Sequence, residues 1–163
     1  MGKEIERRFL VKSEKWRKFS SSSWTIRQGY FNSPVCIRIR IETSLKISAT
    51  ITVKGKPIDD ACRVRPEFEY NIPVQDAYDM LGSFCSKGIS KQRWHVLAKG
   101  NRWEVDVFHG AHNGLVVAEI ELSSADQEIE IPKWVGREVT NDIRYSNHSL
   151  AIHGTDLIED VGE

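Results

Sequence analysis

The sequence has no excess of either charge and no long apolar run. Its 163 residues include 23 Lys and Arg against 23 Asp and Glu, so the net charge is +0. Binding to nucleic acid or to an anionic membrane through bulk electrostatics requires a positive surplus, which this chain lacks. The first ten residues, MGKEIERRFL, do not resemble a signal peptide, and no later segment has the length of a membrane span. We therefore expect a cytoplasmic protein without nucleic-acid or membrane partners.

Cysteine is also scarce. Cys36, Cys62 and Cys85 are odd in number and widely spaced, with no CxxC motif. This pattern argues against a disulfide framework and against a thiolate zinc site. His109 and His112 are three residues apart, but they lie in the Gly-rich turn FHGAHNG rather than on a predicted helix, which disfavours a shared metal. The chemistry is expected to come from other side chains.

Period-two alternation dominates the chain, with β-branched and aromatic residues at the apolar positions and Gly, Pro, Asn or Ser at the breaks. This pattern is typical of half-buried strands. With 40% hydrophobic residues, the length suits a single domain, residues 1–163, of mainly β (α+β) class. The predicted strands are 4–12, 24–32, 35–43, 48–54, 63–72, 89–97, 102–109 and 115–123.

Three segments have helical spacing instead. Segment 13–19 begins with a serine suited to an N-cap, and 75–85 follows a proline and has one apolar side. Segment 142–153 has Ile143 on its apolar side and ends at Gly154, a residue typical of helix ends. We expect this last helix to cover one end of a barrel.

In most of the predicted strands one face is apolar and the other carries charges of both signs. These faces can simply meet water, as one side of an antiparallel sheet does. Eight strands can instead close into a barrel without free edges, and the charges then face inward. The positions are Glu4, Glu6, Arg8, Arg38, Arg40, Glu42, Lys54, Arg63, Arg65, Glu67, Glu69, Lys91, Arg93, Arg102, Glu104, Asp106, Glu119 and Glu121.

An interior of this kind needs compensation, because a buried ion without partners is costly. Pairing between opposite charges supplies part of it, and a bound polyanion with its metal would supply the rest. Arg binds phosphate oxygens through its planar fork, and Lys acts as a point charge. Glu4 and Glu6 point to the same side of one strand, and paired carboxylates bind Mg²⁺ or Mn²⁺.

On these residues the chain resembles the CYTH domain family, also called triphosphate tunnel metalloenzymes. The hallmark of that family is ExExK, and residues 4–8 of this chain read EIERR. The segments RQGYF, CIRIRI, ITVKG, RVRPEFEYNIP, ISKQRW, WEVDVF, GLVVAEIEL and EVTNDIRY follow in the order of the short bacterial, inorganic triphosphatase-like members. The ordered set is far more specific than ExExK alone. It implies a closed eight-stranded antiparallel β-barrel, or tunnel, with a few peripheral and end-covering helices.

The resemblance also implies a role for each charged position. Mg²⁺ or Mn²⁺ would be held by Glu4, Glu6, Glu119 and Glu121. Phosphate oxygens would be bound by Arg8, Arg38, Arg40, Lys54, Arg65, Lys91, Arg93 and Arg144. The catalytic set would be Glu4, Glu6, Arg8, Lys54 and Glu121. Basic residues would be oriented, or a second metal held, by Glu67, Glu69, Asp106 and Asp142.

Several of these positions have alternative interpretations. Arg8 stands where the hallmark has Lys; the charge is kept, but the longer, planar side chain can change where the terminal phosphate sits. Glu67 and Glu69 equally suit internal counter-ions, and Lys54 suits a solvated hairpin lysine. Tyr30 suits either a plug at one barrel end or a contact to the substrate.

The function implied by the resemblance is metal-dependent hydrolysis of a triphosphate phosphoanhydride bond, with inorganic tripolyphosphate as the favoured substrate. Catalysis would consist of positioning and charge neutralisation. Class IV-type adenylate cyclase, thiamine triphosphatase and RNA 5′-triphosphatase stay open as alternatives within the family. A non-catalytic polyphosphate- or nucleotide-binding module and a purely structural barrel are alternatives of other classes. The expected partner is a small polyanionic substrate, and a homodimer stays open.

Overall fold

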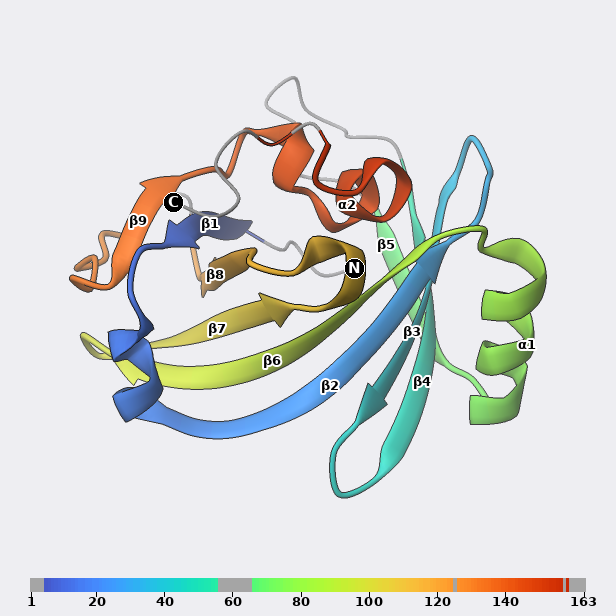
Figure 1. Ribbon diagram of the computed structural model, residues 1–163, viewed down its shortest axis with the longest axis horizontal. Helices are drawn as coiled ribbons and strands as arrows, with labels where there is room; N and C mark the ends of the chain where they lie inside the picture. The colour runs from blue at the N-terminus through green and yellow to red at the C-terminus, as the bar shows by residue number, and fades with distance from the viewer. Residues whose placement is uncertain (1–4, 56–65, 125, 157, 159–163) are drawn as a thin grey trace.

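A single curved antiparallel sheet forms the protein in the computed structural model, which describes residues 5–55, 66–124, 126–156 and 158 (Figure 1). The order of the strands across the sheet is β5-β4-β3-β2-β6-β7-β8-β1-β9. Their bounds are β1 Ile5–Val11, β2 Ser20–Tyr30, β3 Cys36–Thr43, β4 Ile47–Lys54, β5 Glu67–Asn71, β6 Gly88–Ala98, β7 Asn101–Phe108, β8 Val116–Leu122 and β9 Val135–Glu138. The helical elements are η1 Glu14–Phe19, α1 Val74–Phe84, η2 Gly110–His112, η3 Ile143–Tyr145 and α2 Asn147–His153.

The predicted mainly β fold class is confirmed. The structure differs from the predicted closed eight-stranded barrel in that, among the described residues, the sheet has nine strands and is not closed. A ninth strand, β9, pairs with β1 in the register Phe9 opposite Glu138 and Val11 opposite Val135. It occupies the edge of β1 that closure would require, so β9 and β5 stand at the two ends of the sheet. The four residues of β9 are too few to show a strand period in the sequence. The first part of the predicted strand 63–72 lies outside the described residues.

The prediction of one helix over 142–153 is partly wrong. Two polar side chains divide the segment, because Asp142 accepts a hydrogen bond from the Arg144 backbone N–H and Ser146 accepts one from Ser149. Such local caps begin new helical turns. Ile143 is 78% exposed instead of packed. The predicted end at Gly154 is confirmed, with a left-handed φ of 67° that favours glycine.

Apolar residues of the outer face pack against the peripheral helices. One cluster joins Trp103 to Trp16 of η1 and to Trp134, and Trp94 packs edge-on against Trp16. A second cluster lies where α1 covers β3 and β4, and α1 buries Ala77 there (Figure 1). Trp94 and Trp103 thus pack outside the curved sheet, as predicted.

The inner face is divided along its length. At one end, inward apolar residues pack with α2 and η3 in a cluster that includes Tyr30, Phe108, Tyr145 and Leu150. Tyr30 belongs to this apolar end, and its ring lies edge-on to His148 at 5.0 Å between centroids. The plug interpretation of Tyr30 is therefore the one that the structure supports. The rest of the inner face carries the charged residues, together with polar residues such as Gln28 and Thr52.

The outer cluster should dominate stability. Trp103 is 0% exposed, so Trp103→Ala removes a fully buried indole and is expected to lower the free energy of unfolding by about 3–5 kcal/mol. Urea unfolding followed by circular dichroism measures the loss. Ile143→Ala, at an exposed position, is the control and is expected to change the free energy by less than about 0.5 kcal/mol.

Candidate functional site

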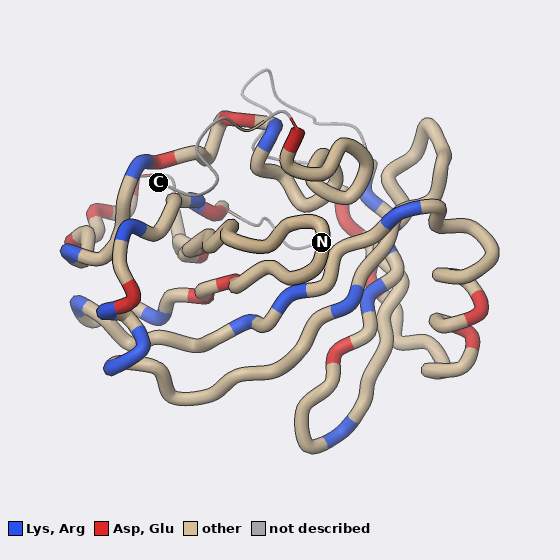
Figure 2. Tube along the Cα trace, viewed as in Figure 1, with Lys and Arg blue, Asp and Glu red and all other residues tan. Residues whose placement is uncertain are grey.

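The register of the strands brings the charged positions onto the concave face. Arg8 of β1 lies opposite Glu119 of β8, and Glu6 lies opposite Glu121. Directly opposed residues of an antiparallel pair share one face of the sheet. Figure 2 shows charges of both signs spaced along the strands. The inward orientation inferred from alternation is therefore confirmed, and it does not depend on barrel closure.

Arg93 is the centre of the most buried ionic network. Its Nε and Nη2 donate to the two carboxylate oxygens of Asp106, both at 2.7 Å, and Nη2 also donates to Glu119 Oε2 at 2.8 Å. Glu104 accepts from its Nη1. Lys91 donates to Asp106 and, at 3.0 Å, to Oδ1 of Asn147, the first residue of α2. Lys91 and Asp106 are 0% and 1% exposed.

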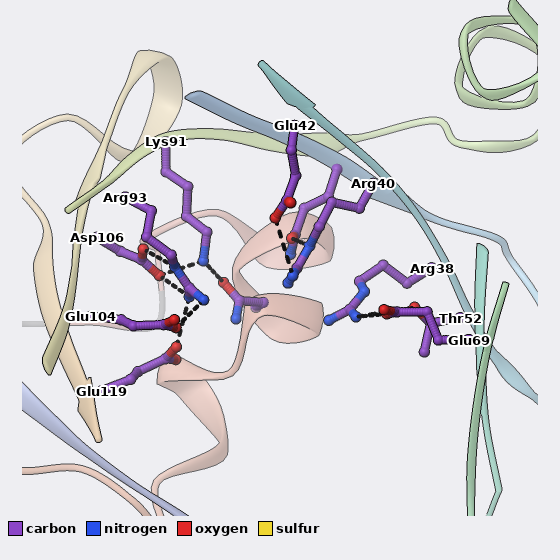
Figure 3. A network of polar contacts seen from close by, with 12 residues as sticks. Arg38, Arg40, Glu42, Thr52, Glu69, Lys91, Arg93, Glu104, Asp106 and Glu119 are labelled. Atoms are coloured by element: carbon purple, nitrogen blue, oxygen red, sulfur yellow. Dashed lines mark hydrogen bonds and ion pairs between the residues drawn. The ribbon is translucent and has the colours of Figure 1, made fainter. Parts of the chain in front are cut away.

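A second network lies on β3, β4 and β5 and faces the first across the interior (Figure 3). Arg38 donates through Nη2 to Thr52 at 3.0 Å and to Glu69 at 3.2 Å. Thr52 in turn donates to Glu69 at 2.8 Å, and Lys54 pairs with Glu67 at 2.7 Å. The structure places both glutamates as counter-ions of basic residues, which is one of the two roles predicted for them.

Arg40 is held by a residue that the sequence analysis did not select. Its Nε donates to Gln28 Oε1 at 3.1 Å, and Gln28 Nε2 donates to the Tyr30 hydroxyl at 3.1 Å. Gln28 is only 1% exposed. A buried amide with both ends bonded fixes the guanidinium in one orientation. Strand parity places Gln28 on the same face as Tyr30, but a single uncharged amide in a strand does not by itself indicate a binding role.

The basic side chains crowd one another at the centre of this space. The pKa of the Arg40 guanidinium is lowered, first by burial and then by the nearby charges of Arg38 and Arg93. Burial also lowers the pKa of the Lys91 ammonium to about 8, although Asp106 opposes the shift. An anion placed among these cations would relieve the repulsion and raise both pKa values, which favours the charged forms.

The pKa values of the carboxyls in the first network are lowered as well, which for an acid favours the charged form. Burial raises the pKa of the Glu119 carboxyl, but attraction to Arg8 and Arg93 outweighs it and holds the pKa well below the usual range. Burial likewise opposes ionisation of Asp106, and Arg93 and Lys91 still keep its pKa below the usual value. Both groups therefore stay ionised at neutral pH.

Not every predicted site residue joins these networks. Arg144 donates to Asp142 at 2.7 Å on η3, where their side chains are 43% and 21% exposed. Glu121 is exposed on β8. Glu4 and Arg65 lie outside the described residues.

Across the described ranges, no three His, Cys, Asp or Glu side chains are grouped as a metal site. Two of the predicted ligands nevertheless meet at one cation. Arg8 Nη2 lies 2.6 Å from Glu6 Oε1, and Arg8 Nε lies 2.9 Å from Glu119 Oε1. Carboxylate oxygens are the donors that Mg²⁺ and Mn²⁺ prefer, so the donor chemistry fits a divalent metal.

Access to the interior differs between its two ends. The apolar cluster under α2 fills one end, and the β3–β4 hairpin borders the other (Figure 1). Near the hairpin is an open cavity of about 390 Å³, whose lining includes Ser22, Trp24, Glu42 and His95. In the described part of the chain no helix is long and apolar enough to span a membrane.

Comparisons with known proteins confirm the resemblance. The model of the CYTH domain family matches residues 2–154. An inorganic triphosphatase of Acetivibrio thermocellus is 39% identical over 153 residues, which cover 92% of this chain and 94% of the relative. One from Nitrosomonas europaea is 32% identical over 155 residues, with coverages of 91% and 97%. The crystal structure of the inorganic triphosphatase NE1496 superposes with a TM-score of 0.66 at 31% identity, covering 93% of this chain and 95% of that one.

Asp106, the shared counter-ion of Lys91 and Arg93, should contribute strongly to the stability of the fold. Asp106→Asn keeps the shape but leaves two buried cations without their carboxylate, so the free energy of unfolding should fall by about 3–5 kcal/mol. Urea unfolding at neutral pH is the measurement. Asp142→Asn breaks a partly exposed pair and should cost about 1 kcal/mol or less. Equal losses in the two variants would contradict the assignment of Asp106 as the buried counter-ion of Lys91 and Arg93.

Proposed function

The chain belongs to the CYTH domain family, and from this premise we propose that it hydrolyses a phosphoanhydride bond of inorganic tripolyphosphate with a divalent metal. One observation carries the proposal. Arg38 and Arg40 on β3 and Arg93 on β6 project from different strands into one space, where their like charges repel each other. A polyanion is the ligand that this arrangement favours. The two inorganic triphosphatases that align over more than nine-tenths of the chain support the choice of substrate.

Phosphate oxygens can replace the carboxylates that now hold the basic groups. Arg38 contacts Glu69 at 3.2 Å, and Arg40 contacts Glu42 only at 3.7 Å, so both contacts are weaker than those of Arg93. A guanidinium fork binds a phosphate in the same bidentate geometry that it uses for a carboxylate. Arg38 and Arg40 would therefore bind the substrate, and Gln28 and Thr52 would fix their orientation. Hydrolysis then rests on positioning and charge neutralisation rather than on a covalent nucleophile.

We assign the metal to Glu6, Glu119 and Glu121, together with Glu4. The metal is Mg²⁺ or Mn²⁺, and it would supply Lewis-acid polarisation of a phosphoryl oxygen. The assignment is supported by the two carboxylates that already contact one cation and by the register of Glu6 with Glu121. The chain's own contribution is to hold Glu119 ionised and to keep Glu6 and Glu119 beside Arg8.

A nucleotide or thiamine triphosphate is the second candidate substrate, because the cavity near the β3–β4 hairpin has room for an organic group. Trp24 supplies an aromatic ring there, and it lies edge-on to His95 at 4.6 Å between centroids. The other lining residues are Leu45 and polar or charged side chains such as Ser22 and Glu42. Adenylate cyclase and thiamine triphosphatase activities therefore belong in the same test.

The test is a matrix of substrates and metals. Tripolyphosphate, ATP and thiamine triphosphate are each incubated with Mg²⁺ and with Mn²⁺, and phosphate, pyrophosphate and cyclic AMP are measured. We expect the fastest phosphate release from tripolyphosphate. Formation of cyclic AMP from ATP would identify an adenylate cyclase and overturn the proposed hydrolysis. Tight tripolyphosphate binding without turnover would identify a non-catalytic binding module.

Glu6→Gln tests the carboxylate assignment. The amide keeps the shape but removes the negative charge, so metal-dependent turnover should fall by about 100-fold or more. Glu14→Gln, on the exposed outer helix η1, is the matched control and should leave turnover unchanged. Unchanged turnover of the Glu6→Gln enzyme would remove Glu6 from the site.

The pH dependence of kcat/KM should reflect the titration of the Lys91 ammonium. Because burial lowers its pKa to about 8, Lys91 loses its proton as the pH rises through that value, and the free enzyme then binds phosphate less well. We expect kcat/KM to fall above pH 8 by at most about tenfold per pH unit. Lys91→Arg keeps its charge and should move the fall to higher pH. The same substitution at exposed Lys15 should not move it, and an unshifted profile for Lys91→Arg would contradict the assignment.

A further inference from the structure

Arg8 bridges two strands through one edge of its guanidinium. Nη2 donates to Glu6 Oε1 at 2.6 Å, and Nε donates to Glu119 Oε1 at 2.9 Å. The backbone N–H of Arg8 donates to Thr140 Oγ1 at 3.0 Å, which fixes the strand from which the side chain extends. The side chain is 11% exposed. The guanidinium thus fills the space between the two carboxylates.

The second oxygen of Glu119 is occupied as well. Oε2 accepts from Arg93 Nη2 at 2.8 Å, so both oxygens of this carboxylate are engaged by guanidinium groups. A guanidinium does not lose its proton in proteins, so Arg8 and Arg93 stay charged at all working pH values. A divalent cation therefore meets a carboxylate that is already neutralised and a fixed positive charge beside it.

We propose that Arg8 is a built-in competitor of the divalent metal for Glu6 and Glu119, so that metal binding requires its guanidinium to leave both carboxylates. The inference rests on the proposed function, because it takes these glutamates as metal ligands. A released guanidinium is free to bind a phosphate oxygen, for which its fork is suited. Arg8 would then exchange one anionic partner for another during substrate loading.

The competition with the metal depends on the planar fork of the Arg8 guanidinium as well as on its charge. Two N–H groups on one edge reach carboxylates on β1 and β8 at the same time. A lysine ammonium is a compact point charge on a flexible stem and has no such fixed edge. Arg8→Lys therefore keeps the positive charge and weakens the bridge, whereas Arg8→Met removes both.

The neighbouring residue provides a matched control. Arg7 points to the opposite face of β1, where Nε and Nη2 donate to Glu138 at 2.9 and 2.7 Å. It has the same fork geometry on a carboxylate, but on the face of β1 opposite to Glu6 and Glu119. Glu138 also accepts from Thr140 Oγ1, which accepts from the Arg8 backbone N–H, so this link runs through the backbone of Arg8 and not through its guanidinium. Arg7→Lys thus reproduces the chemical change of Arg8→Lys on the opposite face of the same strand.

The experiment measures Mn²⁺ binding to the whole protein without substrate, from the electron paramagnetic resonance signal of free Mn²⁺. Loss of one charge-assisted hydrogen bond corresponds to about a tenfold change in affinity. We expect Arg8→Lys to lower the Kd for Mn²⁺ by about tenfold, Arg8→Met to lower it further, and Arg7→Lys to leave it unchanged. Unchanged or weaker Mn²⁺ binding by Arg8→Lys, or no binding by any variant, would overturn the proposal.

A second measurement follows the guanidinium itself and needs no variant of Arg8 to fold. In the wild-type protein, the Arg8 Nε–H should lose its protection from hydrogen exchange, measured by NMR, as Mg²⁺ is added. Retained protection at saturating Mg²⁺ would also overturn the proposal. Neither the Mn²⁺-binding measurement nor the hydrogen-exchange measurement depends on turnover. Failure of the proposed competition can therefore be distinguished from failure of the proposed hydrolysis.

Discussion

Mutual neutralisation of charged residues on neighbouring strands is the interaction on which the rest of this structure depends. Arg93 and Asp106 stand directly opposite each other in the register of β6 and β7, and their side chains form a bidentate pair inside the curved sheet. Lys91, with no exposed surface, shares the same carboxylate. A buried pair of this kind is costly to break, because the remaining ion has no solvent to stabilise it. These charges can therefore face inward, although Lys91 and Asp106 have almost no exposed surface.

This neutralisation does not require the sheet to close. The outer face is covered by Trp16 of η1 and by α1, and one end of the interior is filled by the apolar cluster that contains Tyr145 and Leu150. These contacts hold the curvature from outside and from one end. The interior keeps its charged wall on both sides although β9 takes the free edge of β1.

The same pairing prepares the interior for a polyanion. Carboxylates such as Glu69 and Glu119 hold the basic side chains in extended, ordered positions before a ligand arrives. Preorganised charge is more effective than charge that must be collected at the moment of reaction. Arg8 contacts Glu6 and Glu119, two of the carboxylates to which we assign the divalent metal.

The sequence by itself determined the strands, their inward charged faces and the family, since alternation and motif order are local properties of the chain. It also identified Arg38, Arg93 and Glu119 as candidate site residues. It did not reveal β9, which becomes a strand only because β1 offers it an edge, or Gln28, whose role depends on a hydrogen bond to Arg40 across two strands. Only the tertiary structure decided which carboxylate neutralises which base. That choice is made by distances between strands that are far apart in the chain.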